Sequence, residues 1–347
     1  MNNSTTANPA LRFSLGCALP ILLSGCNTVV LNPAGDIALQ QGRLLIISTL
    51  LMLLIIVPVI ALIGFFAWKY RQSNITARYE PDWDHSTALE LVIWGAPLLI
   101  IIVLGLLTWI GTHILDPYRK LDRIDATRPV SAHTRSLRVE VVALDWKWLF
   151  IYPDLNIATV NELVAPVDVP IEFSITASTV MNSFFIPALA GQIYAMPGMQ
   201  TSLNAVINKA GVYDGFSANY SGAGFSDMKF KFHGMHQADF DLWVQSLKAD
   251  QTLDSQTYLQ LEKPSERTPV MHFGGVDASL YHAILNRCVG GSAMCADQMM
   301  MADARSNQRF YARSNPTSTT GQFAEIDSEI CTRTPSSLKV NKYVRAN

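Results

Sequence analysis

The stretch LRVEVVA, from Leu137 to Ala143, decides the class of the domain that fills the second half of this chain. Its apolar residues largely alternate with other residues, and a period of two is typical of a strand with one buried face. The same alternation recurs at residues 171–176, 203–207 and 229–232. Turn-forming residues separate these stretches, so the sequence predicts an all-β sandwich over residues 136–250.

Two long apolar runs precede this domain. The first extends from Leu44 to Trp68 and the second from Leu91 to Ile114, and each is long enough to cross a bilayer as a helix. Pro58 lies inside the first run, which a membrane helix tolerates. We therefore expect a transmembrane hairpin within residues 26–115, followed by a polar connector over residues 116–135.

The N-terminus has the pattern of a targeting segment. A short apolar run follows Arg12, and the residues Leu23-Ser24-Gly25-Cys26 come directly after it. This ending resembles the lipobox of bacterial lipoproteins, and the resemblance implies removal of residues 1–25 and lipidation of Cys26. An ordinary signal sequence with an incidental cysteine is the alternative.

Beyond the sandwich, residues 239–247, 255–261 and 277–287 are predicted helices, and the tail from residue 306 is polar. Residues 251–347 are thus expected to form a small helical extension with a polar tail. Cys288, Cys295 and Cys331 would lie in an oxidising compartment, where one disulfide is expected. The sequence does not decide which two of them pair.

The whole composition fits a membrane protein and gives no support for a nucleic-acid partner. The chain has 347 residues, 49% hydrophobic and only 16% charged, with a formal net charge of −2. The predicted fold class is therefore membrane α plus all-β, with a two-helix hairpin, a sandwich and a small helical extension.

One loop of the predicted sandwich connects the chain with a known family. Residues Asn219–Met228 and the preceding order of elements resemble subunit II of the haem–copper terminal oxidases. Copper-bearing members carry Cys-x-Glu-x-Cys-x-x-x-His-x-x-Met in this loop and one further histidine upstream. The matching positions here are Asn182, Tyr220, Gly222, Gly224, Met228 and Lys231.

These residue types decide which branch of the family the chain resembles. A dicopper centre needs thiolates and imidazoles, and tyrosine, glycine and lysine do not replace them. The resemblance therefore points to the copper-free, quinol-oxidising branch of the cytochrome bo type. It implies a cupredoxin-like sandwich, with no metal and no other cofactor in this chain.

Glu90 is a second candidate site. It opens the run Glu90-Leu91-Val92-Ile93-Trp94-Gly95-Ala96-Pro97, which is similar to a Glu-x-x-x-Trp-x-x-Pro run of the family. In that family the glutamate marks the entry of a proton path into subunit I. The alternative is a solvated carboxylate favoured by the positive end of the helix.

The resemblance also implies a function and partners. The complex would oxidise ubiquinol, reduce oxygen to water and pump protons, with haem and copper in subunit I. This chain would be a non-catalytic subunit that braces subunit I, contacts smaller membrane subunits and helps proton entry. It would be a lipid-anchored, multi-pass protein of the bacterial inner membrane, with its large domain in the periplasm.

Two alternatives of other classes remain. One is a cytochrome c oxidase subunit II with a rearranged metal site, and the other is a membrane-anchored lipoprotein that acts as an adaptor or assembly factor. Among the remaining motifs, we expect Asp145–Trp148 to pack on the sandwich, and we expect Met299–Met301 to fill a core. His233 and His236 are three apart, but no further metal ligands are evident near them.

Overall fold

The computed structural model describes residues 28–78, 82–131, 134–291 and 294–314, and side chains only as far as residue 306 in the last range. The expected signal segment 1–25, the lipid-attachment residue Cys26 and Cys331 lie outside the described residues.

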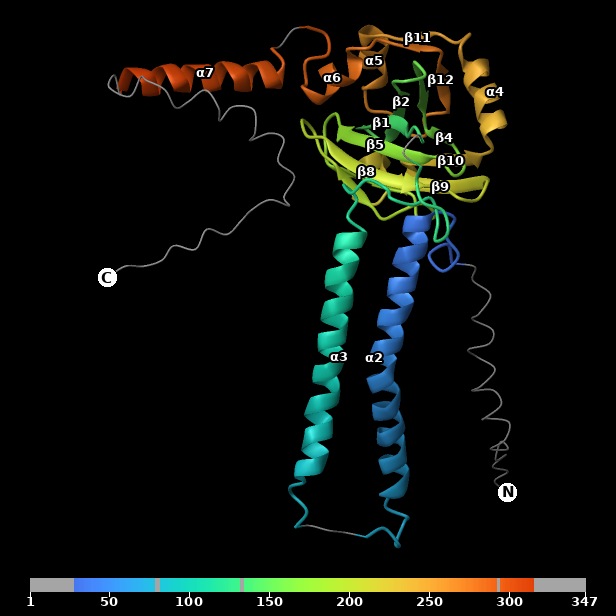
Figure 1. Cartoon of the computed structure of the whole chain (residues 1–347), viewed down its shortest axis with the longest axis vertical. Coiled ribbons are helices and arrows are strands. Elements are labelled where there is room, and N and C mark those ends of the chain that lie inside the picture. Colours follow the sequence, from blue (N-terminus) through green and yellow to red (C-terminus); the bar gives the residue numbers. More distant parts are fainter. Residues whose placement is uncertain (1–27, 79–81, 132–133, 292–293, 315–347) are drawn as a thin grey trace, which may run out of the picture. The chain divides into compact units, whose positions relative to one another are not determined.

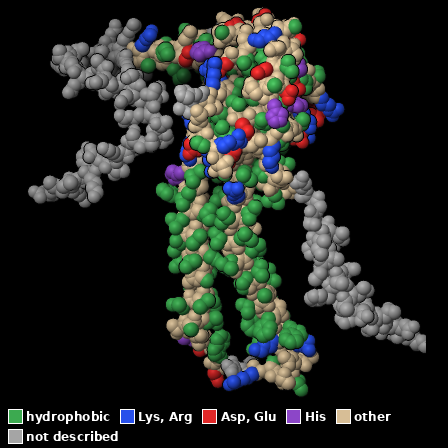
Figure 2. All heavy atoms as spheres, turned by 45° about the vertical axis from the view of Figure 1, so that its right-hand side comes forward, with side chains coloured by type: hydrophobic (Ala, Val, Ile, Leu, Met, Phe, Trp, Pro, Cys, Tyr) green, Lys and Arg blue, Asp and Glu red, His purple; other side chains and the backbone are tan. Residues whose placement is uncertain are grey.

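The predicted hairpin consists of helices α2 (Asp36–Lys69) and α3 (Thr87–Ile114). They are the two helices of the described chain that are long and apolar enough to cross a membrane. Hardly any of their side chains are buried inside the chain, and apolar side chains cover both helices in Figure 2. The α2 helix begins eight residues before the apolar run, because its first two turns are tied to the sandwich.

The link to the sandwich is made of backbone contacts. Ala34 and Gly35 donate backbone hydrogen bonds to the carbonyl of Ala188, at 3.0 and 2.8 Å. Gly35 also forms an isolated bridge with Ile207, directly beyond strand β8 (Thr201–Val206). Helix α2 therefore emerges from the base of the sandwich (Figure 1).

The sandwich consists of two sheets. The first has the order β12-β3-β2-β1-β5-β8, and the second has the order β4-β10-β9-β6-β7. The first sheet, apart from β8, is built from β1 (Leu137–Leu144), β2 (Lys147–Tyr152), β3 (Ile157–Val160), β5 (Pro170–Ala177) and β12 (Met271–Phe273). The second is built from β4 (Glu162–Pro166), β6 (Asn182–Phe185), β7 (Ile193–Ala195), β9 (Gly211–Ser217) and β10 (Lys229–Met235).

Aromatic side chains fill the space between the two sheets. Phe184 and Phe230 of the second sheet stack with their ring centroids 5.5 Å apart. Trp148 of the first sheet meets both rings edge-on, at 5.3 and 5.8 Å. All three are almost completely buried, and such pairs stabilise a core beyond the area that they bury.

A second core lies on the outer face of the first sheet. Val142, Leu144 and Leu149 point away from the sandwich interior and are nevertheless fully buried. Helices α5 (Ser255–Leu261) and α6 (Leu280–Leu285) cover them. The expectation of strands with one buried face is therefore wrong for this part of the sheet, because the C-terminal extension covers its other face.

The extension is not only helical. Strand β12 pairs with β3, and β11 (Thr252–Leu253) pairs with β13 (Gly275–Val276). Helix α4 (Gln237–Leu247) precedes it, as predicted. The extension thus completes the first sheet as well as covering it.

The last described element is helix α7 (Ala296–Ser314), part of a separate compact unit that begins at Met294. Its Met299, Met300 and Met301 are exposed, so the expectation that they fill a core is wrong. Cys288 and Cys295 are both disulfide-bonded, as an oxidising compartment favours.

Candidate functional site

The loop that carries copper in the resembling family is covered here by an indole. Trp146 lies in the tight connection between β1 and β2, where Leu144 pairs with Lys147. Its φ of 67° is uncommon for a residue with a side chain. The indole Nε1 donates a hydrogen bond of 3.0 Å to the carbonyl of Ser221, in the loop between β9 and β10. A contact between residues 75 positions apart thus closes this end of the sandwich.

Two glycines of the loop make room for the indole. A Cβ atom at Gly224 would lie 2.6 Å from Cγ and Cδ2 of Trp146, which is closer than carbon atoms approach. A Cβ atom at Gly222 would lie 3.1 Å from the same ring, and Gly222 has a φ of 115° that favours glycine. Both positions therefore depend on having no side chain. Gly222 precedes the short 3₁₀ helix η1 (Ala223–Asp227), and Gly224 lies within it.

A hydrogen-bonded cluster replaces the upstream ligand. Asn182 opens strand β6 and is almost completely buried. Its Oδ1 accepts a 3.1 Å hydrogen bond from the hydroxyl of Ser217, and its Nδ2 donates to the carbonyl of Val180. The hydroxyl of Ser217 also contacts the carbonyl of Asn219. Because buried polar groups need partners, this network fixes the loop without a metal.

The three remaining positions point in different directions. Met228 is buried in the main core, and Tyr220 is exposed and meets the ring of Phe225 edge-on. Lys231 is exposed and forms a 2.5 Å ion pair with Asp214. Of these three side chains, only Met228 lies in the interior of the domain.

The side chains of this end of the domain do not fit a dicopper centre. None of the six is a thiolate or an imidazole, and the Trp146 indole packs against the glycines that match ligand positions. Across the described residues, no group of three or more His, Cys, Asp or Glu is arranged to hold a metal ion.

The segment Asp145–Trp148 packs on the sandwich, as expected, and the burial of Lys147 shows why. Trp148, the next residue, is part of the aromatic core, and Lys147 is itself buried on the other face of β2. Its Nζ donates to the carbonyl of Lys263 at 2.8 Å and to the hydroxyl of Ser265 at 2.7 Å. Burial lowers the pKa of the Lys147 ammonium. This buried lysine ties the C-terminal extension to the first sheet.

The histidines of the domain associate differently from the sequence expectation. Glu162 of β4 contacts His272 at 2.7 Å and His233 at 3.5 Å, one through each carboxylate oxygen. His236 instead stands at the N-cap of α4. His233 and His236, three apart in the sequence, thus have different surroundings, and His233 shares the Glu162 carboxylate with His272.

Glu90 lies in the first turn of α3, at the end of the hairpin away from the sandwich. Its Oε1 is 2.7 Å from Nδ1 of His85, and Nε2 of His85 is 3.2 Å from the hydroxyl of Thr87. When Glu90 is ionised, its carboxylate can only accept this hydrogen bond, and Nδ1 of His85 donates it. Sequence reasoning missed His85, whose position just before the N-cap Ser86 was the available signal.

Glu90, Trp94 and Pro97 are spaced i, i+4 and i+7, so they share one face of α3. Trp94 is 77% exposed, and the Glu90 side chain is 51% exposed. Within the part of the chain that the structure describes, both side chains are therefore left largely uncovered.

Comparison with known proteins agrees with this geometry. The model of the family "Cytochrome C oxidase subunit II, periplasmic domain" matches residues 154–234, and that of the "COX Aromatic Rich Motif" matches residues 248–292. The second match coincides with the segment that builds the outer core and contains the buried rings of Tyr258, Phe273 and Tyr281.

Relatives similar over most of the chain share one description. The Pseudomonas putida protein named cytochrome bo(3) ubiquinol oxidase subunit 2 is 49% identical over 271 residues, covering 78% of this chain and 83% of that protein. The Pseudomonas aeruginosa protein of the same name is 48% identical, covering 82% and 83%. The ubiquinol oxidase subunit 2 of Acetobacter aceti is 47% identical, covering 85% and 93%. This chain belongs to the family of subunit 2 of the cytochrome bo(3)-type ubiquinol oxidases.

Proposed function

We propose that this chain serves as the copper-free subunit II of a proton-pumping ubiquinol oxidase in the bacterial inner membrane. The observation that carries the proposal is the Trp146 indole, which packs on Gly222 and Gly224 where relatives with copper have ligands. Quinol delivers electrons from within the membrane, so a copper relay in the periplasmic domain is unnecessary. Oxygen reduction at haem and copper is assigned to subunit I.

The bare faces of the hairpin support a bracing role. Apolar side chains cover α2 and α3, and few of them are buried within the chain. Such surfaces need lipid or other membrane helices as neighbours, so the hairpin is well suited to pack against subunit I and the smaller subunits. Copurification with a large haem-containing membrane protein tests this role, and a chain purified without haem would favour the adaptor alternative.

The contact between His85 and Glu90 supports a role in proton entry. The imidazole can take up a proton from water at Nε2 and release the Nδ1 proton to the Glu90 carboxylate. Glu90 would then pass the proton to polar groups of subunit I along the uncovered face of α3. Both side chains are more than half exposed, so exchange with water stays open.

The test of proton entry is steady-state oxygen uptake by purified complexes of equal haem content. Glu90→Gln removes the titratable group and keeps its size, so we expect a partial, severalfold loss of turnover. His85→Gln should cause a smaller loss, because water can still reach Glu90. The control Asp84→Asn removes a neighbouring charge and should leave turnover unchanged. Wild-type turnover of Glu90→Gln across pH would favour the solvated-carboxylate alternative.

The path of the N-terminal segment supports a lipid anchor at Cys26. The carbonyl of Val30 lies against Gly42, because a Cβ atom there would be 2.8 Å from it. Residue 30 is therefore level with the second turn of α2, immediately before the apolar run begins. Cys26 precedes residue 30 by only four positions in the sequence. An intact mass should reveal loss of residues 1–25 and added acyl mass, and a mature protein retaining residues 1–25 would refute the anchor.

Copper titration separates the quinol oxidase from a cytochrome c oxidase subunit with a rearranged metal site. We expect all of the copper in the purified complex to belong to subunit I and none to this subunit. A purple dicopper absorption assigned to the periplasmic domain would overturn the proposal.

A further inference from the structure

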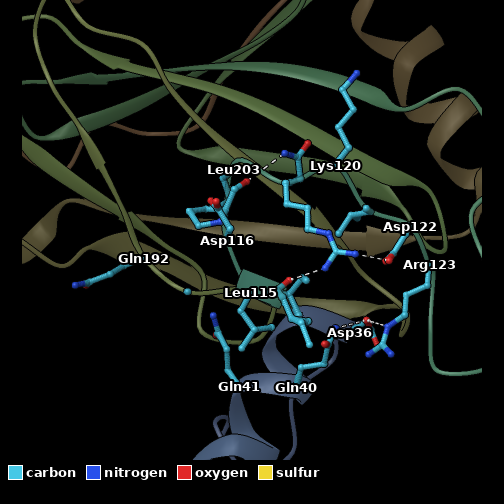
Figure 3. Close-up of a pocket in the computed structure, with 17 residues that line it drawn as sticks. Asp36, Gln40, Gln41, Leu115, Asp116, Lys120, Asp122, Arg123, Gln192 and Leu203 are labelled. Carbon is cyan, nitrogen blue, oxygen red and sulfur yellow. Dashed lines mark hydrogen bonds and ion pairs between the residues drawn. The ribbon is translucent and has the colours of Figure 1, made fainter. Parts of the chain in front are cut away.

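A polar cavity of about 290 Å³ lies where the hairpin meets the sandwich (Figure 3). It is lined by the first turns of α2, by the segment after α3 that contains Arg119, Lys120 and Arg123, and by Gln192 and Asn204 of the sandwich. Its volume is close to the lower end of the range of ligand pockets.

The rigid side of this cavity is an ion pair. Asp36 is almost completely buried, and it accepts hydrogen bonds from Nε and Nη2 of Arg123 at 2.8 and 3.1 Å. Gln40 donates a third hydrogen bond to the same carboxylate, at 2.7 Å. These contacts join segments 87 residues apart and hold the Arg123 guanidinium at the cavity edge, with Nη1 outside the pair.

An apolar groove of about 300 Å³ continues from the polar cavity between the two helices. The two share Gln40, Ile114, Leu115 and Arg123, and the groove adds Leu44, Ile47, Leu107 and Ile110. The helices approach each other at its inner side, because a Cβ atom at Gly111 would lie 3.2 Å from Leu44. The polar cavity and the apolar groove are therefore adjacent.

The charges indicate what would occupy this space. Arg43 lines the groove immediately before the apolar run, whereas the Lys120 side chain points away from the Asp36–Arg123 pair (Figure 3). Within the described residues Arg43 has no ion-pair partner, whereas Arg119 and Arg123 are paired with Asp122 and Asp36. A phosphate beside Arg43 would neutralise this cation, and an acyl chain would fill the apolar groove.

We propose that the cavity and the groove together bind one glycerophospholipid of the membrane leaflet next to the sandwich. The phosphodiester lies beside Arg43 and the Arg123 guanidinium, which both line the groove, and one acyl chain follows Ile47 and Leu107 between the helices. Phosphate accepts hydrogen bonds from guanidinium groups, and the headgroup level is where cations at the ends of apolar runs are found. The lipid seals the joint between the hairpin and the sandwich.

The test is native mass spectrometry of the purified complex in mild detergent, with phospholipids identified by fragmentation. We expect the wild-type complex to retain one phospholipid more than the Arg43→Gln variant. Removing this cation should weaken retention of the lipid about fivefold. The control Arg71→Gln removes a cation at the other end of α2 and should retain the lipid.

A second variant tests the groove independently of charge. Ile47→Trp fills the groove without changing a charge, and this variant should also lose the lipid. The control is Ile63→Trp, further along α2, which should keep the lipid. Equal retention in wild type and all variants would overturn the proposal, as would a retained molecule without phosphorus. A photocrosslinker at Leu107 that captures another subunit in place of a phospholipid would also overturn it.

Discussion

The sandwich and the membrane hairpin treat the same residue type in opposite ways. Trp148 is fully buried between the sheets, where it meets Phe184 and Phe230, whereas Trp94 on α3 is 77% exposed. The sandwich therefore encloses its apolar side chains within one chain. The apolar side chains of the hairpin become buried only against lipid and other subunits. The sequence of the hairpin therefore specifies an interface with these neighbours more than a core of its own. Each variant below separates these two kinds of burial.

The largest expected effect is that of Trp148→Ala. Removing the largest side chain of the core leaves a cavity, and such truncations cost about 3–5 kcal/mol in the free energy of unfolding. Guanidinium unfolding of the chain in detergent, followed by near-UV circular dichroism, measures the change. A midpoint equal to that of the wild type would mean that the core does not hold the domain together.

Gly224→Val should have the next largest effect. The new side chain would overlap the Trp146 indole, and overpacking of this kind costs about 1–3 kcal/mol. The matched control is Gly64→Val on α2, where no atom lies within 4 Å of the added Cβ. The same unfolding measurement should separate the two. If both variants unfold at the same denaturant concentration, the indole does not depend on the glycine.

Glu140→Gln tests a half-buried carboxyl on β1. Burial raises the pKa of Glu140 to about 7, although Arg138 opposes the shift. The folded protein therefore keeps a proton that the unfolded chain releases near pH 4.5, and stability falls as the pH rises between these values. Relative to wild type, Glu140→Gln should gain about 1–2 kcal/mol near pH 8, after allowance for solvent screening, and nothing near pH 4.5.

The control for this prediction is Glu172→Gln on the neighbouring strand β5, at the position paired with Arg138. Its unfolding midpoint should follow the wild-type pH profile. Parallel profiles of wild type and Glu140→Gln from pH 4.5 to 8 would contradict the raised pKa.

Trp94→Ala should have the smallest effect on the isolated chain. The side chain touches little of its own chain, so the free energy of unfolding should change by no more than about 0.5 kcal/mol. The haem content that copurifies with the subunit should nevertheless decrease, because the uncovered face of α3 is damaged. Loss of domain stability in this variant would show that the hairpin and the sandwich are not energetically separate.

Local periodicity was enough to predict the membrane hairpin, the sandwich and a helix of the extension. The apolar runs of α2 and α3, the alternation of β1 and β5, and the helix at Ser255–Leu261 are all readable within short windows of sequence. The outer core was not predicted, because Val142 looks like an exposed strand position until the extension, more than 100 residues later, covers it. Local patterns do not contain such information.

The candidate sites likewise divide into features that a local motif predicts and contacts that only the structure reveals. The resemblance identified Glu90 and the six former ligand positions by their motifs. It did not reveal His85 beside Glu90 or the Trp146 indole above Gly224, because each is a contact in space with no fixed motif. The pairing of His272 with Glu162 was equally invisible, since it depends on the register of a strand that had not been predicted.

The contact between Trp146 and Gly224 also sets a condition for engineering a metal site into this chain. A metal-binding loop would need a cysteine at residue 224, and its Cβ atom would meet the indole at 2.6 Å. The cysteine would therefore have to be introduced together with a smaller residue at position 146.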